Sequence, residues 1–343
     1  MSGLLTGLSV LGGVVLIGVI GYNEWLQKKA TMRTAEGEGL RRDPAETSAP
    51  PPAAAAEMVL PIAAGVASAA QPIDALIDSI ITLDFPLPHY GEALLAAMPA
   101  TRRIGSKSLL VEGLSTESGL WESPQAGRQY SQAQMAIQLA NRSGALNEVE
   151  FSEFVSKANT YAGFIDAYVA APDMGEEVAR ARELDEFASR LDTRLELRIL
   201  AREASWSAGY VQQHAQRLGF SLGLYPGRMV YADLRAEPAQ PLVVLKFDAH
   251  AALAEDLSDS AVRDLTLELD VSHVPREAKA YDLMRELAIQ LAAGMGGKIV
   301  DGAGQVITEA TMNAIDEQLQ HIYDQLDARD LSAGSALARR LFA

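Results

Sequence analysis

Apolar and polar positions follow their clearest pattern between residues 262 and 329. Every second residue from Leu265 to Val271 is apolar, which is the period of a half-buried β-strand. Residues 280–294 change to a helical period, and residues 298–301 suit a short strand. Thr308 is a suitable N-cap for a last amphipathic helix. One apolar sheet face and two apolar helix faces can bury one another, so this stretch predicts a two-layer α+β unit.

A similar order of elements precedes this unit. The pattern predicts strands over residues 79–85, 108–114, 120–121, 135–139, 195–200, 222–225, 229–231 and 242–247, and helices over 91–97, 151–168, 176–191 and 208–218. A polar turn and an aromatic-led helix follow both 135–139 and 265–269. We therefore predict an internal duplication whose first copy lacks a clear final short strand. Two unrelated α+β domains are the alternative.

The N-terminus carries a long uncharged segment. No charged residue occurs from Gly3 to Tyr22, and a helix of this length spans roughly 30 Å, the thickness of the bilayer core. A cleaved signal peptide is the alternative, but no Lys or Arg precedes the segment, as a signal peptide requires. Lys28, Lys29 and Arg33 follow it, so the positive-inside rule predicts an outer N-terminus and a cytoplasmic bulk.

Residues 26–72 have the composition of a linker. Glycine alternates with glutamate at 36–39, and prolines at 50–52 precede a run of alanines, without any strand or helix period. A chain of this length has an r.m.s. reach on the order of 35 Å. Residues 59–70 are more apolar and suit either an alanine-rich spacer, which we favour, or a short docking helix.

These patterns predict a domain order and a fold class. We expect a transmembrane helix over residues 3–25, a flexible linker over 26–72, a degenerate α+β repeat over 73–191, a second α+β domain over 193–329 and a tail over 330–343. Each α+β unit should be an antiparallel sheet with helices packed on one face.

Composition excludes several functions. The net charge of −16 argues against nucleic acid as a main partner, and the absence of cysteine excludes disulfides and thiolate metal sites. With 48% hydrophobic residues, the 343-residue chain can bury a core.

We find no catalytic constellation in the sequence. The five histidines (His89, His214, His250, His273 and His321) lack metal-ligand spacing. Residues 294–298 resemble a phosphate-binding loop only superficially, because a predicted helix precedes them and isoleucine follows the lysine. We therefore expect no enzyme, no cofactor, no metal site and no small-molecule substrate.

Several segments resemble the ZipA family, membrane anchors of the bacterial division ring that bind the C-terminal tail of the tubulin-like GTPase FtsZ. They are residues 212–223 (QQHAQRLGFSLG), 265–271, 283–284 and 296–301 (GGKIVD). The order of outer N-terminus, single span, Pro-rich linker and C-terminal domain is also similar. The resemblance covers less than half of the chain.

The resemblance implies a binding face. In the family, the FtsZ tail lies as a mostly helical peptide on the exposed sheet face. By position, the partner-binding residues here would be Tyr225, Val244, Lys246, Asp248, Thr266 and Glu268. The same face would include Asp270, with Glu196 and Arg198 from the first strand, so most of its residues are charged, whereas the family's face is largely apolar. Burying unpaired charges is costly. Three explanations stay open: different binding chemistry, a platform supplied by the first copy, or packing of the two copies together.

The sequence and the resemblance together predict a cell division protein in the bacterial inner membrane. Its cytoplasmic domains would bind FtsZ filaments, and Gly3–Tyr22 would anchor them. The alternative is an anchored scaffold that binds other envelope or division proteins.

Overall fold

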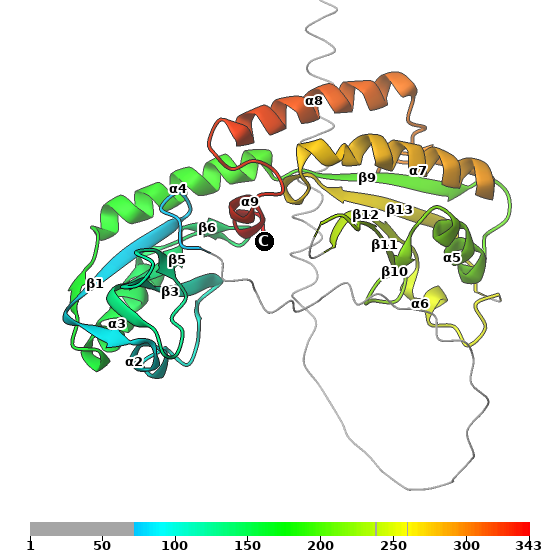
Figure 1. Ribbon diagram of the computed structural model, residues 1–343. Coiled ribbons are helices and arrows are strands. Elements are labelled where there is room, and N and C mark those ends of the chain that lie inside the picture. The colour runs from blue at the N-terminus through cyan, green and yellow to red at the C-terminus, as the bar shows by residue number, and fades with distance from the viewer. Residues whose placement is uncertain (1–71, 237–238, 259) are drawn as a thin grey trace, which may run out of the picture. The chain divides into compact units, whose positions relative to one another are not determined.

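The computed structural model describes residues 72–236, 239–258 and 260–343 (Figure 1). The predicted transmembrane helix over 3–25 and nearly all of the predicted linker lie outside these residues. Among the helices that the structure describes, none is long and apolar enough to cross a membrane. The described chain has a mixed α+β fold with antiparallel sheets, which confirms the predicted fold class at this level.

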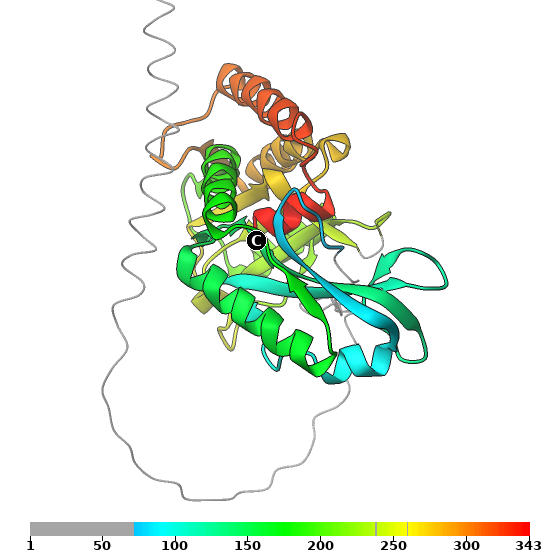
Figure 2. The ribbon, with the colours of Figure 1, turned by 90° about the vertical axis from the view of Figure 1, so that its left-hand side faces the viewer.

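The first half of the described chain forms one antiparallel sheet with helices against it. Its elements are β1 (Asp78–Tyr90), α2 (Gly91–Ala96), β2 (Arg103–Ile104), β3 (Lys107–Ser115), β4 (Trp121–Glu122), β5 (Gln129–Gln138), β6 (Ala140–Asn141), β7 (Gly144–Ala145), α3 (Glu148–Phe164), β8 (Tyr168–Ala170) and α4 (Met174–Leu191). The strand order is β2-β3-β5-β1-β8, with β4 paired to β3, while β6 and β7 form a separate hairpin. Figure 2 shows α3 lying along one face of this N-terminal sheet.

The second half repeats this architecture with one more long strand. Its elements are β9 (Arg194–Ala201), α5 (Ala208–Arg217), β10 (Ser221–Leu222), β11 (Arg228–Asp233), β12 (Gln240–Lys246), α6 (Ala249–Ala252), β13 (Asp264–Asp270), the 3-10 turns η1 (Val271–His273) and η2 (Arg276–Ala278), α7 (Ala280–Met295), β14 (Gly297–Val300), α8 (Glu309–Asp327) and α9 (Ala336–Leu341). The strand order of this C-terminal sheet is β10-β11-β12-β13-β9-β14. In Figure 1, α7 lies against the C-terminal sheet and α8 lies over α7.

The two halves place corresponding strands alike. The first strand of each half lies between the last long strand and a short final strand: β1 between β5 and β8, and β9 between β13 and β14. The expectation that the first copy lacks this final short strand is therefore wrong. The helix predicted over 151–168 ends at Phe164 instead, because Asp166 adopts a left-handed conformation (φ 49°) and Tyr168 begins β8. Common origin by duplication stays a prediction.

The alternating apolar residues form the core, as the pattern predicts. Leu265, Leu267 and Leu269 are at most 1% exposed and face α7. At the end of α7, Gly296 takes the left-handed conformation (φ 66°) that terminates the helix. The next residue, Gly297, lies so close to β9 that a Cβ atom there would be 2.6 Å from the side chain of Ile199. Glycine is required at both positions for β14 to return beside β9.

The last fourteen residues, 330–343, for which the sequence suggests only a tail, carry the buried helix α9. Arg340 in α9 forms an ion pair with Asp78 at the start of β1, with Nη1 and Oδ2 3.0 Å apart. Their side chains are 3% and 0% exposed. The backbone carbonyl of Arg340 accepts a hydrogen bond from Gln138 Nε2 at 2.6 Å, and Arg340 Nη1 donates to Pro72 O at 3.0 Å. Helix α9 therefore joins the C-terminal half to the first strand of the N-terminal half.

The Asp78 carboxylate depends on this partner. Burial raises the pKa of Asp78, and the charge of Arg340 opposes this shift without reversing it. A carboxylate so deeply buried would be left uncompensated if Arg340 were removed.

We expect Arg340→Leu to lower the free energy of unfolding by about 3–5 kcal/mol, because it leaves Asp78 buried without a cation. The control Arg182→Leu breaks an exposed pair with Glu148 and should cost about 1 kcal/mol or less. Denaturant unfolding followed by circular dichroism measures both. The double variant Asp78→Leu/Arg340→Leu should be less destabilised than Arg340→Leu alone. Equal losses for the two arginine variants would contradict the assigned role of the buried pair.

Candidate peptide-binding face

The candidate site is the face of the C-terminal sheet that points away from α7. Side chains alternate along each strand, so the residues between the buried Leu245, Leu267 and Leu197 point to this outer face. Strand register defines two neighbouring rows across β11, β12, β13 and β9. One row is Val230, Val244, Glu268 and Glu196, and the other is Arg228, Lys246, Thr266 and Arg198. We call these eight positions the C-terminal face.

The structure brings together four of the six residues that the sequence assigns to partner binding. Val244 and Lys246 on β12 lie directly opposite Glu268 and Thr266 on β13, so the four side chains form one contiguous block. All four are partly buried. Whether they bind a partner stays a prediction.

The other two predicted residues lie off the face. Tyr225 is in the turn between β10 and β11 and is 63% exposed. Asp248 follows β12 and caps α6, since its Oδ1 accepts a hydrogen bond from the backbone N–H of His250 at 2.8 Å. Its carboxylate therefore has a local structural task. Both residues lie near one end of the face, where the backbone N–H of Phe247 donates to Gly227 O at 2.9 Å.

Three of the five charged residues on the C-terminal face, Lys246, Glu268 and Arg198, are in ion pairs. Lys246 forms an ion pair with Glu268, and their side chains are 30% and 18% exposed. Next to them, Arg198 Nη2 lies 2.7 Å from Asp264 Oδ2. A peptide lying over Lys246 and Glu268 would cover charges that already have partners, which costs much less than burying unpaired ones.

The apolar part of the face is small, and sequence reasoning missed one member of it. Val230 on β11 lies directly opposite Val244, so the two valines form a short aliphatic strip beside the Lys246–Glu268 pair. The buried Met229 next to Val230 could have indicated its direction, because neighbours in a strand point to opposite faces.

Asp270, at the end of β13, contacts the N-terminal half. Its carboxylate lies 2.8 Å from Arg142 Nη2, 3.4 Å from Arg194 Nε and 3.3 Å from His273 Nδ1. Arg142 also pairs with Asp192 at 2.6 Å. Burial opposes ionisation of Asp270, but His273 and Arg142 outweigh that effect and lower its pKa. Asp270 therefore helps to hold the two halves together and is not free to meet a partner.

Two further features describe the site's surroundings. An open hollow of about 380 Å³ lies at the edge strand β14, away from the C-terminal face, and its lining includes Ile289, Lys298 and Val306. Within the described ranges 72–236, 239–258 and 260–343, no cluster of three or more His, Asp or Glu side chains could hold a metal ion.

The C-terminal sheet packs helices on one face and presents a mixed charged and aliphatic surface on the other. Comparison with known families gives a match over part of the chain. The family model of the ZipA C-terminal FtsZ-binding domain matches residues 247–318, from α6 through β13, α7 and β14 into α8. This match confirms the resemblance to ZipA-type proteins in this part of the chain. A search of curated proteins found no match.

We expect Asp270→Asn to lower the free energy of unfolding by about 1–3 kcal/mol at neutral pH, because Asp270 accepts charge-assisted hydrogen bonds. Since the pKa of Asp270 is lowered in the folded state, its contribution is present above the unfolded-state pKa of about 3.9 and disappears as pH falls through the folded-state value. The difference between wild type and variant should therefore shrink below about pH 4.

Urea unfolding of both proteins between pH 3 and pH 7 tests this expectation. Glu186→Gln is the control, because it removes an exposed carboxylate that pairs with Arg190 within one helix. A difference between wild type and Asp270→Asn that does not depend on pH would contradict the assigned ionisation.

Proposed function

We propose that this protein is a bacterial cell division protein whose C-terminal domain binds the C-terminal tail of FtsZ. The observation that carries the proposal is the match of residues 247–318 to the ZipA FtsZ-binding domain. The matched segment includes β13, which supplies Thr266 and Glu268 to the C-terminal face, and α7, which supports that strand from behind. Strand β12, with Val244 and Lys246, precedes the matched segment and pairs with β13.

We infer that the tail lies as a helix across β12 and β13. Val230 and Val244 offer contact to its apolar side chains, while Lys246 and Glu268 offer one charge of each sign to polar groups at the margin. A helical peptide held by aliphatic anchors at intervals of three and four residues suits a surface of this kind. Because the aliphatic strip is short, we expect a weak single site.

We further propose that the chain is anchored in the inner membrane by the uncharged segment Gly3–Tyr22, with its folded part in the cytoplasm. The predicted linker over 26–72 would hold the folded part away from the bilayer. Weak sites then suffice, because a filament that presents many tails to many anchored copies gains avidity.

An anchored scaffold that binds a different division or envelope protein is the second candidate. The observation that favours it is the Lys246–Glu268 pair on a face where the resemblance implies apolar contact. A partner with a complementary charge pair would fit this surface better than an apolar peptide.

We expect the Val244→Glu variant to bind a fluorescent FtsZ tail peptide about tenfold more weakly than wild type, a difference of about 1.4 kcal/mol, because the new carboxylate occupies the aliphatic strip. Fluorescence anisotropy with the full-length chain in nanodiscs measures the affinity. Val149→Glu is the matched control: it makes the same change on α3, where Val149 is 77% exposed.

Two outcomes would contradict the proposal in different ways. If wild type fails to bind the tail peptide at sub-millimolar concentration, FtsZ is not the partner and the scaffold candidate gains. If both valine variants weaken binding equally, the tail binds away from the C-terminal face.

A further inference from the structure

The N-terminal sheet carries an unassigned surface on the face opposite its core. Strand register places Trp121 opposite Leu114, Leu114 opposite Gln132, Gln132 opposite Asp84, and Asp84 opposite Tyr168. These five residues form one straight row across β4, β3, β5, β1 and β8, and directly opposite residues in a sheet point to the same side. We call them the aromatic row. Their strand neighbours Leu83 and Ala133 are fully buried in the core, so the row points outward.

The aromatic row has exposed rings at its two ends. Tyr168 is 76% exposed and Trp121 is 38% exposed. With neighbouring strands about 4.8 Å apart, four strand spacings separate the rings by roughly 19 Å. Exposed tryptophan and tyrosine are typical of protein-binding surfaces, because they provide a large contact area and lose little conformational entropy.

Two acidic groups on this face, Asp84 and Glu112, have no cationic partner among the described residues. Asp84 Oδ1 accepts a hydrogen bond from Gln132 Nε2 at 2.6 Å. In the next row, Glu112 Oε2 accepts one from Gln134 Nε2 at 2.8 Å. Neither carboxylate belongs to any of the ion pairs between residues that the structure describes. This surface thus combines unpaired carboxylates with exposed rings, whereas the C-terminal face carries the Lys246–Glu268 ion pair at its centre.

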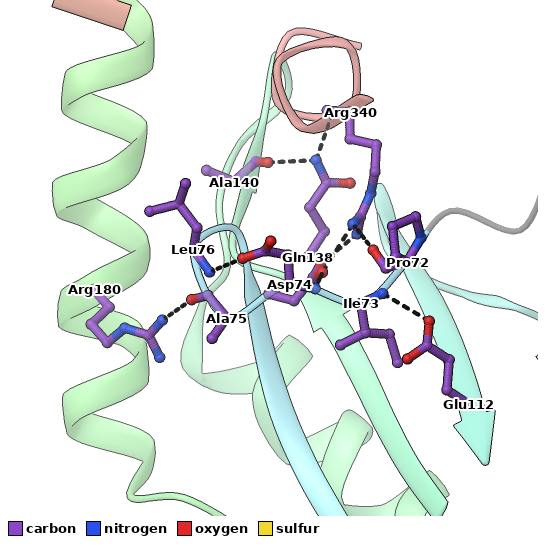
Figure 3. A network of polar contacts seen from close by, with 11 residues as sticks. Pro72, Ile73, Asp74, Ala75, Leu76, Glu112, Gln138, Ala140, Arg180 and Arg340 are labelled. Carbon is purple, nitrogen blue, oxygen red and sulfur yellow. Dashed lines mark hydrogen bonds and ion pairs between the residues drawn. The ribbon is translucent and has the colours of Figure 1, made fainter. Parts of the chain in front are cut away.

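Part of the same face is already covered by the chain itself. The backbone N–H of Ile73 donates to Glu112 Oε1 at 3.0 Å, so the segment that leads into β1 crosses the second row (Figure 3). The aromatic row lies two residues further along the strands, roughly 7 Å away. A partner can therefore occupy the aromatic row without displacing Ile73.

We propose that the aromatic row binds a basic amphipathic helix of a protein partner. A central Lys or Arg of that helix would lie over Asp84, and its aliphatic side chains would contact Leu114 and the two rings. Cations gain additional stabilisation near tryptophan and tyrosine faces. A helix of about 13 residues spans the distance between the rings at 1.5 Å per residue. The net charge of −16 adds long-range attraction for such a partner.

Charge distinguishes this occupant from the others. Residues 43–71, which precede the described chain, contain no lysine, arginine or histidine, so the nearest preceding cation is Arg42, thirty positions before Pro72. A second copy of the chain would bring the same negative charge, which repels association. The proposal does not rest on FtsZ binding, because it concerns a different sheet.

The test uses the full-length chain in nanodiscs and a fluorescein-labelled amphipathic peptide of 13 residues, with leucines along one face and one central lysine. We expect saturable binding in fluorescence anisotropy. Asp84→Lys should weaken it at least about tenfold, since it replaces attraction by repulsion at the centre of the row. The matched control Glu183→Lys changes charge equally on the exposed face of α4 and should leave binding unchanged. A peptide with a central glutamate should not bind.

A second readout reports contact with the row itself. Trp121 is one of three tryptophans, and binding should change the emission spectrum of wild type but not of Trp121→Phe. Unfolding midpoints of all variants verify that they fold. Equal binding of the lysine and glutamate peptides, or no effect of Asp84→Lys, would overturn the proposal. So would self-association of the chain that Asp84→Lys abolishes, because a second copy would then occupy the row. Val244→Glu, which should weaken binding of the FtsZ tail, should leave binding of the lysine peptide intact. A failure of the present proposal can therefore be distinguished from a failure of the proposed FtsZ binding.

Discussion

The buried ion pair between Asp78 and Arg340 is the constraint on which the arrangement of the described chain depends. It joins residues 262 positions apart, at the first strand and the last helix. Desolvating two charges is costly, and the cost is recovered only when both have partners with good geometry. Arg340 contacts Asp78 through both Nη atoms and Pro72 through Nη1, which leaves only its Nε without a hydrogen-bond partner among the described residues, and its backbone carbonyl accepts a hydrogen bond from the Gln138 amide. The pair therefore selects one placement of α9 rather than simply adding stability.

The ion pairs around Asp270 act in the same direction at a second location. Arg142 lies in the N-terminal half and contacts carboxylates from both halves, so it fixes the end of β13 against the β6–β7 hairpin and α4. Two polar contacts, distant from each other in sequence, thus hold two separate sheets in a single unit. The outer faces of the sheets differ in chemistry: one carries the Lys246–Glu268 pair beside a short aliphatic strip, and the other carries unpaired carboxylates and exposed rings.

The sequence predicts most elements but few of the contacts between them. Alternation from Leu265 to Val271, the cap at Thr308 and the glycines at 296 and 297 act locally, so local patterns are sufficient to find β13, α8 and the end of α7. Helix α9 has only six residues. Its packing depends on the ion pair between Arg340 and Asp78, and no local sequence pattern reveals a partner so distant in the chain. Part of the C-terminal face could be predicted from the sequence, because alternate residues along one strand point to the same side of the sheet. The aromatic row was not, because it depends on the register of five strands.

The contact between Arg340 and Pro72 has a mechanical consequence. A pull that arrives at Pro72 loads its contact with Arg340 and the hydrogen bond between Ile73 and Glu112, and then reaches Asp78 and β1. Strand β1 is thirteen residues long and pairs on both sides, with β5 and with β8. A pull along β1 loads many hydrogen bonds together in shear, whereas a pull across it would open them one after another. The described chain thus receives tension at its longest strand.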